Sequence, residues 1–225
     1  MKPKKHISSP RCEHVILLHG LCRTPASLRR VAAALRAEGF VTHNIAYPSR
    51  TASTARLADD TIGPAIRECE QAGAVAIHFV GHSLGCILVR SYLRRHPHPP
   101  ALGRVVMLAP PNQGSEVVDH LRDWKLYQWI TGPVGQELGT DAASVPLQIG
   151  AVDFAVGVLA GSRTINWINS AFFLKGVDDG KVSVARTRVE GMADHRVLPA
   201  THTFITSDGT AIRQTIHFLR NGKFA

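Results

Sequence analysis

The sequence predicts an α/β protein whose central sheet is mostly parallel, with about six strands and helices on both faces. Short apolar runs of strand length alternate along the chain with segments whose apolar residues recur at helical spacing. This alternation is typical of parallel strands joined by crossover helices. The 225 residues, 44% of them hydrophobic and 19% charged, can bury a sizeable core. We therefore expect one domain over 1–225, with its core at 14–220 and a basic tail at 1–11.

The expected strands are the short apolar runs. In chain order they are residues 15–18, 40–46, 75–80, 105–108, 154–159 and 195–198. Ligands of open parallel sheets bind beyond the carboxyl ends of the strands, so polar residues that directly follow these runs are the first candidates for a site.

Four helices are expected between and after the strands. The first begins at Thr24, with Pro25 at its first position, and ends at Gly39. The second covers 54–71, where Pro64 should kink or break it. The third follows a glycine turn at 81–85 and ends before the proline-rich segment at 96–100. The last has Ile212, Ile216 and Leu219 on one face and is capped by Ser207 or Asp208.

The segment 110–150 is the one long irregular stretch of the chain. A connection of this length is typical of a functional cap or lid. The segment also contains an apolar helical face. This face could form a lid or a wall of the site, or it could pack on the core, and both interpretations stay open. That face comprises Val117, Leu121, Trp124 and Tyr127, with Trp129 and Ile130 following.

The net charge of +9 comes from small groups of basic residues. They are interpreted as solvated faces, with attraction to an anionic surface or substrate as the alternative. No recognition helix, aromatic RNA-binding strand or long basic tract accompanies them. We therefore expect no nucleic-acid partner, while peripheral contact with a lipid surface stays open.

No apolar run approaches the ~20 residues that span a bilayer, and no signal sequence is recognisable. The chain as given is expected to be cytoplasmic, although a secreted form with its leader removed would look the same. The four cysteines form no CxxC pair, which disfavours zinc and thioredoxin-like sites. A disulfide among Cys12, Cys22, Cys69 and Cys86 stays open.

The segment Gly81-His82-Ser83-Leu84-Gly85 matches the pattern GxSxG. It follows an expected strand and opens an expected helix, which is the setting of a nucleophile elbow. The strained turn would expose the Ser83 hydroxyl, and the two glycines would let neighbouring backbone approach closely. The alternative is an ordinary glycine turn.

A serine nucleophile needs donors for the oxyanion that forms on its substrate. His19-Gly20-Leu21 directly follows the first expected strand and so lies at the same edge of the sheet as Ser83. We expect the backbone N–H groups of Leu21 and Leu84 to form the oxyanion hole, supported by His19, Gly20 and His82. A plain His-Gly turn is the alternative.

The acid should follow the serine in the chain, and the base should follow the acid. Asp179 lies in a tight turn before Gly180 and is the preferred acid, with Asp178 as a solvated neighbour. Asp153 precedes a strand and so lies at the wrong end of the sheet. Asp208 is expected to cap the last helix instead.

The preferred base is His202, which lies after the last strand and before the last helix. His195 starts that strand, and His217 lies inside the final helix. Ser115 lacks the strand–turn–helix setting and is interpreted as a turn or cap residue, not as a second nucleophile.

Together these motifs resemble the α/β-hydrolase superfamily, and within it the small bacterial lipases and esterases. The resemblance covers residues 14–220 and includes the segment Ala109 to Ser115 after the fourth strand. It implies an α/β-hydrolase fold and a serine hydrolase of carboxylic esters, with a Ser83–His202–Asp179 triad and with no cofactor or metal. The chain differs from larger lipases because it has no obvious long cap domain and no evident calcium site.

Three functions follow as hypotheses. The leading one is hydrolysis of a small-molecule or lipid ester through an acyl-enzyme on Ser83. The second transfers the same acyl group to an acceptor other than water. The third is a hydrolase-like protein that only binds, against which the complete set of Ser83, Asp179 and His202 argues.

Overall fold

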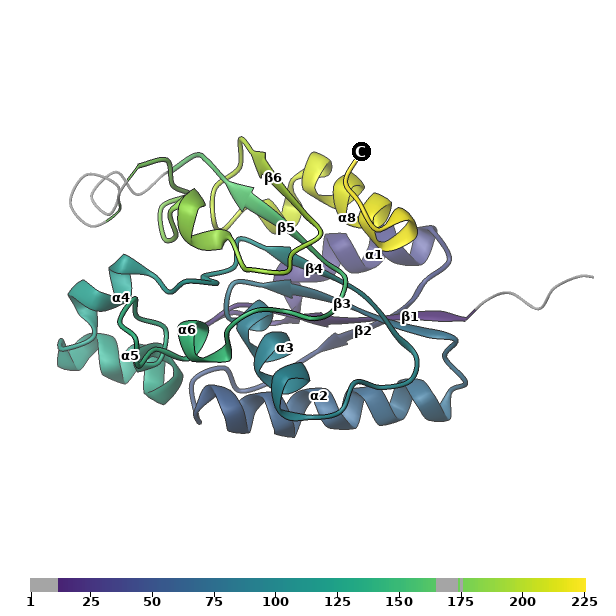
Figure 1. Cartoon of the computed structure of the whole chain (residues 1–225), viewed down its shortest axis with the longest axis horizontal. Coiled ribbons are helices and arrows are strands. Elements are labelled where there is room, and N and C mark those ends of the chain that lie inside the picture. Colours follow the sequence, from purple (N-terminus) through teal and green to yellow (C-terminus); the bar gives the residue numbers. More distant parts are fainter. Residues whose placement is uncertain (1–11, 165–173, 175) are drawn as a thin grey trace, which may run out of the picture.

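Six parallel strands form one sheet in the order β2-β1-β3-β4-β5-β6 (Figure 1). The structure, a computed structural model, describes residues 12–164, 174 and 176–225, so the expected basic tail at 1–11 lies outside it. The sheet confirms the predicted fold class, and every pairing in it is parallel. The strands are β1 Glu13–Leu18, β2 Val41–Ile45, β3 Ala76–His82, β4 Leu102–Leu108, β5 Val156–Gly161 and β6 Asp194–Leu198.

The register brings the carboxyl ends of the strands to one edge. Leu18 at the end of β1 pairs with Gly81, and His82 at the end of β3 pairs with Leu108. Gly161 at the end of β5 pairs with Leu198. Loops that follow these strands therefore start side by side, which is the condition for a shared site.

Successive residues of each strand face opposite layers of the molecule. In β1, Ile16 and Leu18 pack into the core under α2 and α3, whereas Val15 and Leu17 pack under α1 and α8. Both layers are visible in Figure 1, with α2 and α3 on one side of the sheet and α1 and α8 on the other. The layers consist of η1 Pro25–Leu28, α1 Arg29–Ala37, α2 Thr54–Gln71, α3 Leu84–Arg95, η3 Ile205–Ser207 and α8 Gly209–Asn221.

Three helix expectations concern a cap or a proline. Pro64 lies inside the continuous helix α2, so the helix does not break there. Thr24 takes the N-cap position of the 3₁₀ turn η1 and Pro25 is its first residue, as expected, although the Thr24 side chain makes no capping hydrogen bond. Asp208 does cap α8, because its carboxylate accepts a hydrogen bond from the Ala211 N–H at 2.8 Å.

The stretch 110–150 contains three short helices, α4 Glu116–Leu121, α5 Lys125–Gln136 and α6 Val145–Ile149. The expected single apolar face is wrong, because the chain turns between α4 and α5. Trp124 lies in this turn, at the N-cap position of α5. As a result Trp124 is 64% exposed, while Val117, Leu121 and Tyr127 point into a cavity. These helices lie at the carboxyl end of the sheet (Figure 1).

In the described part of the chain, no helix is both long and apolar enough to cross a membrane. The four cysteines are free thiols in the structure. The disulfide that the sequence left open is therefore not formed.

Candidate active site

Ser83 occupies a strained turn between β3 and α3. Its φ of 52° and ψ of −116° lie where a residue with a side chain is rarely found. The flanking glycines make the turn feasible. A Cβ at Gly81 would lie 2.7 Å from the Cys86 nitrogen, and one at Gly85 would lie 2.2 Å from the Leu18 carbonyl oxygen. The strained backbone and the close approaches together match the elbow predicted from the sequence.

Three predicted residues form one hydrogen-bonded chain. The His202 Nε2 atom lies 3.0 Å from the Ser83 Oγ, and its Nδ1 atom lies 2.8 Å from Asp179 Oδ2. The arrangement suits the tautomer in which Nδ1 carries the proton and Nε2 accepts from the serine hydroxyl. His202 comes from the loop after β6, so residues that are 119 positions apart in the sequence meet here.

Asp179 is held by its own loop. It is 2% exposed, and its Oδ1 atom accepts hydrogen bonds from the backbone N–H groups of Lys181 and Val182 at 3.0 and 2.9 Å. Burial raises the pKa of this carboxyl, but the charge of His202 and the hydrogen bonds outweigh burial, so the pKa lies below its ordinary value. Asp179 is therefore ionised and orients the imidazole.

The neighbouring Asp178 is not the solvated residue that was expected. It is 7% exposed, and its Oδ1 atom accepts the Gly180 N–H at 2.7 Å. The reason is the tight Asp-Gly turn, in which each carboxylate folds back onto backbone N–H groups. Both acids are thus structural parts of the turn, and only Asp179 contacts His202.

The rival residues lie outside this chain of hydrogen bonds. Asp153 precedes β5 and lies 3.5 Å from His98 at the other end of the sheet. His195 contacts the Thr187 hydroxyl at 2.8 Å, and His217 donates to the Lys223 carbonyl within the C-terminal region.

The loop after β1 lies beside Ser83. Leu21 lines the same cavity, and Leu84 is the first residue of α3, so its N–H has no partner within that helix. The Tyr47 hydroxyl fixes this loop by donating a hydrogen bond to the His19 carbonyl. The Tyr47 and His19 rings also stack, with their centroids 4.1 Å apart. A Cβ at Gly20 would lie 2.9 Å from His82 Nδ1, so this close approach requires glycine.

His82 has a defined position that the sequence did not specify. Its Nε2 atom donates a hydrogen bond to the His202 carbonyl oxygen at 2.9 Å. Burial, followed by the charge of His202, lowers the pKa of His82 to about 3, so its ring is neutral. The residue before Ser83 thus fixes the backbone of His202.

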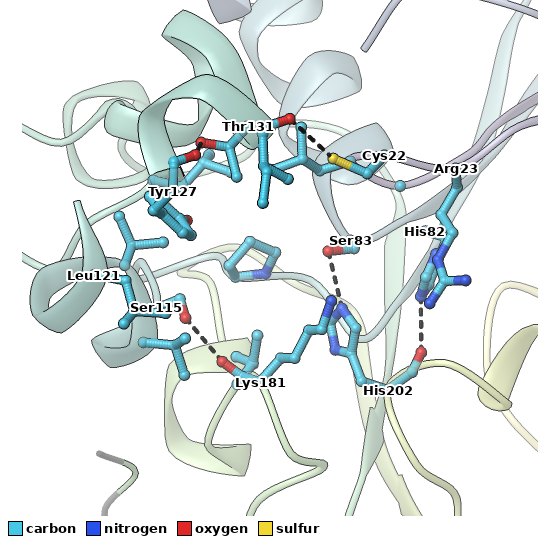
Figure 2. Close-up of a pocket in the computed structure, with 18 residues that line it drawn as sticks. Cys22, Arg23, His82, Ser83, Ser115, Leu121, Tyr127, Thr131, Lys181 and His202 are labelled. Carbon is cyan, nitrogen blue, oxygen red and sulfur yellow. Dashed lines mark hydrogen bonds between the residues drawn. The ribbon is translucent and has the colours of Figure 1, made fainter. Parts of the chain in front are cut away.

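Ser83 opens onto a cavity of about 340 Å³ that is mostly apolar. Its walls come from the loop after β1, the helices α4 and α5, and the acid loop (Figure 2). Ser115 also lines it, and its hydroxyl donates to the Lys181 carbonyl at 2.8 Å, which ties the helical segment to the acid loop. Ser115 precedes α4 but makes no side-chain cap, so its role is this link.

A known family matches the part of the chain that carries Ser83. A model of the alpha/beta hydrolase fold matches residues 13–138, more than half of the chain. The chain belongs to the alpha/beta hydrolase family. The family expected from the sequence motifs is therefore confirmed.

Several solved alpha/beta hydrolases share this fold. The mature lipase BlEst2 of Bacillus licheniformis is 17% identical, with a TM-score of 0.72 and coverage of 98% of this chain and 96% of that one. The phospholipase PlaB of Legionella pneumophila is 18% identical, with a TM-score of 0.69 and coverage of 94% and 59%. The metagenomic carboxyl esterase MGS0156 is 19% identical, with a TM-score of 0.59 and coverage of 86% and 65%. No curated protein sequence matches this chain.

In the described part of this alpha/beta hydrolase, one group of residues has ligand atoms close enough together for a metal ion, namely His14, His43 and Cys69. It lies at the opposite end of the sheet from Ser83. The two imidazoles already contact each other at 3.0 Å and stack at 5.1 Å with an angle of 23° between their planes. Imidazole lone pairs lie in the ring plane, so this near-parallel stack fits a hydrogen-bonded pair better than two ligands that converge on one ion.

Proposed function

We propose that this alpha/beta hydrolase is a serine hydrolase that cleaves carboxylic esters through an acyl-enzyme on Ser83. The observation that carries the proposal is the continuous hydrogen-bonded chain from Ser83 through His202 to Asp179 at the mouth of an apolar cavity. A serine hydroxyl is a weak nucleophile, and a base oriented by a buried carboxylate is the usual means of activating it.

In the proposed reaction, Ser83 Oγ attacks the ester carbonyl carbon while His202 Nε2 accepts the hydroxyl proton. The ester oxygen becomes an oxyanion beside the backbone N–H groups of Leu21 and Leu84, where each donor contributes about 3 kcal/mol to transition-state stabilisation. His202 then returns the proton to the departing alcohol. Water attacks the acyl-enzyme by the same route and releases the acid.

The cavity supports an ester substrate with a short acyl chain. Ligand cavities range over about 300–1,000 Å³, and 340 Å³ is at the small end of that range. Leu121, Tyr127 and Ile130 supply apolar surface for the acyl group. None of these three side chains is charged, so binding an acyl chain against them desolvates no charged group. We therefore propose an esterase rather than a lipase for long-chain fats.

A panel of p-nitrophenyl esters from acetate to palmitate tests this function. We expect kcat/KM to be highest for short chains and to vanish in Ser83→Ala. Ser27→Ala, which alters a half-buried serine outside the cavity, should behave like the wild type. Turnover that persists in Ser83→Ala would overturn the proposal. Product analysis with added alcohols separates hydrolysis from the acyltransferase alternative, for which ester exchange would exceed acid release.

A further inference from the structure

The cavity beside Ser83 carries an excess of positive charge. Among the described residues that line it, two are cationic, Arg23 and Lys181, and none is acidic. Asp179 lies behind His202 and does not line the cavity, and its single negative charge offsets only part of the two positive charges. A positive cavity with apolar walls attracts anionic ligands, because the walls focus the field.

The structure holds Lys181 at this position from two sides. Its backbone N–H donates to Asp179 Oδ1 at 3.0 Å, and its carbonyl accepts from the Ser115 hydroxyl at 2.8 Å. Figure 2 shows its side chain extending from this anchored backbone toward Ser83 and His202. Within the described chain, the ammonium group makes no hydrogen bond and no ion pair, which leaves three donors for a ligand.

Arg23 approaches from the loop after β1. One of its guanidinium nitrogens donates to the Thr203 hydroxyl at 3.0 Å, next to the base His202. The other donors have no carboxylate partner among the residues that the structure describes. Arg23 and Lys181 line the same cavity as Ser83, so an anion held by them would sit close to the scissile bond.

The two cations also destabilise each other. Partial burial, followed by the charge of Arg23, lowers the pKa of Lys181 below its ordinary value. Two like charges that line one cavity favour binding of an anion between them.

We propose that Lys181, assisted by Arg23, forms an anion subsite that selects esters bearing a carboxylate or phosphate group near the scissile bond. This inference depends on the proposed esterase function, because the subsite acts on the substrate of Ser83. The anion can belong to the acyl group or to the alcohol, and the two sources are distinguished by the substrates of the test.

Two matched substrate pairs test the subsite. For the acyl side, the pair is the p-nitrophenyl monoester of glutaric acid and p-nitrophenyl valerate, which have the same chain length but differ in charge. For the alcohol side, the pair is the acetate ester of glycerol phosphate and that of glycerol. We expect kcat/KM to favour the anionic member of at least one pair by about tenfold, the value of a charge-assisted hydrogen bond.

The variant Lys181→Met removes the charge but keeps the length of the side chain. We expect it to abolish the anion preference, Lys181→Arg to retain it, and Lys223→Met, which alters a lysine outside the cavity, to match the wild type. A wild type that hydrolyses the neutral esters without preferring the anionic ones would overturn the subsite while leaving the esterase function intact. A preference that survives in Lys181→Met would also overturn it. Loss of all ester turnover in the wild type would instead contradict the proposed function.

Discussion

His82, the residue before Ser83 in the chain, donates a hydrogen bond from its Nε2 atom to the backbone carbonyl of His202 at 2.9 Å. The nucleophile and the base are thus linked twice, once through the Ser83 side chain and once through the ring of its neighbour. The second link holds the loop that carries His202, so we assign His82 as a positioning residue.

Replacing His82 should impair the chemical step more than substrate binding. We expect His82→Leu to lower kcat by about tenfold to a hundredfold with a smaller change in KM, because His202 loses its backbone anchor. His82→Gln, whose amide can donate to the same carbonyl, should recover part of the loss. Steady-state kinetics on a p-nitrophenyl ester measure both effects. Unchanged kcat in His82→Leu would show that the hydrogen bond does not position the base.

The two neighbouring aspartates should respond differently to substitution. Asp179→Asn should lower kcat by about 10⁴, because the amide favours the wrong tautomer of His202. Asp178→Asn should keep most of the activity, because the asparagine oxygen can still accept the Gly180 N–H. Comparison of kcat for the two variants is the measurement. A larger loss in Asp178→Asn would mean that the acid has been assigned to the wrong residue.

Two glycine substitutions test the close packing under the elbow. A Cβ at Gly85 would lie 2.2 Å from the Leu18 carbonyl oxygen, so Gly85→Ala should destabilise the protein by about 3 kcal/mol or more. Gly209 begins α8 and has only the flexible end of Arg213 near it, so Gly209→Ala should be neutral or stabilise by up to about 1 kcal/mol. Urea unfolding measures both. Equal stability of the two variants would contradict the packing.

The buried His82 should make stability depend on pH. Its pKa is 6.5 in the unfolded chain and about 3 when folded, so between these values only the unfolded state binds the proton. Stability contributed by neutral His82 is therefore complete above pH 6.5 and is lost as the pH falls toward 3, with a slope of up to about 1.4 kcal/mol per pH unit. Urea unfolding measures the free energy of unfolding of the wild type and of His82→Gln. The wild-type value minus the variant value should decrease as the pH falls from 6.5 toward 3. A constant difference would contradict neutral burial of His82.

The strand pattern was sufficient to predict where the proposed triad gathers. Parallel strands end at one edge, so residues that directly follow the strands, such as Ser83 and His202, could be expected to meet there. The structure has both within hydrogen-bonding distance. Local turn signals likewise distinguished the cap Asp208 from the proposed acid Asp179.

The remaining features depend on contacts that spacing does not encode. Asp178 is buried because a tight turn folds its carboxylate onto the backbone, and adjacent acids look alike in a sequence. The turn between α4 and α5 has no strong breaker at Trp124, so one continuous helical face was expected. Lys181 and Arg23 belong to loops from opposite parts of the chain, and only folding brings both to the cavity.

Covalent trapping of the nucleophile tests the central claim most directly. The intact protein is incubated with a fluorophosphonate, digested, and its peptides are analysed by mass spectrometry. The account predicts a single phosphonylated peptide, modified at Ser83, and no adduct in the Ser83→Ala variant with a circular dichroism spectrum like the wild type. An unmodified Ser83 in active protein, or an adduct that persists in Ser83→Ala, would contradict it.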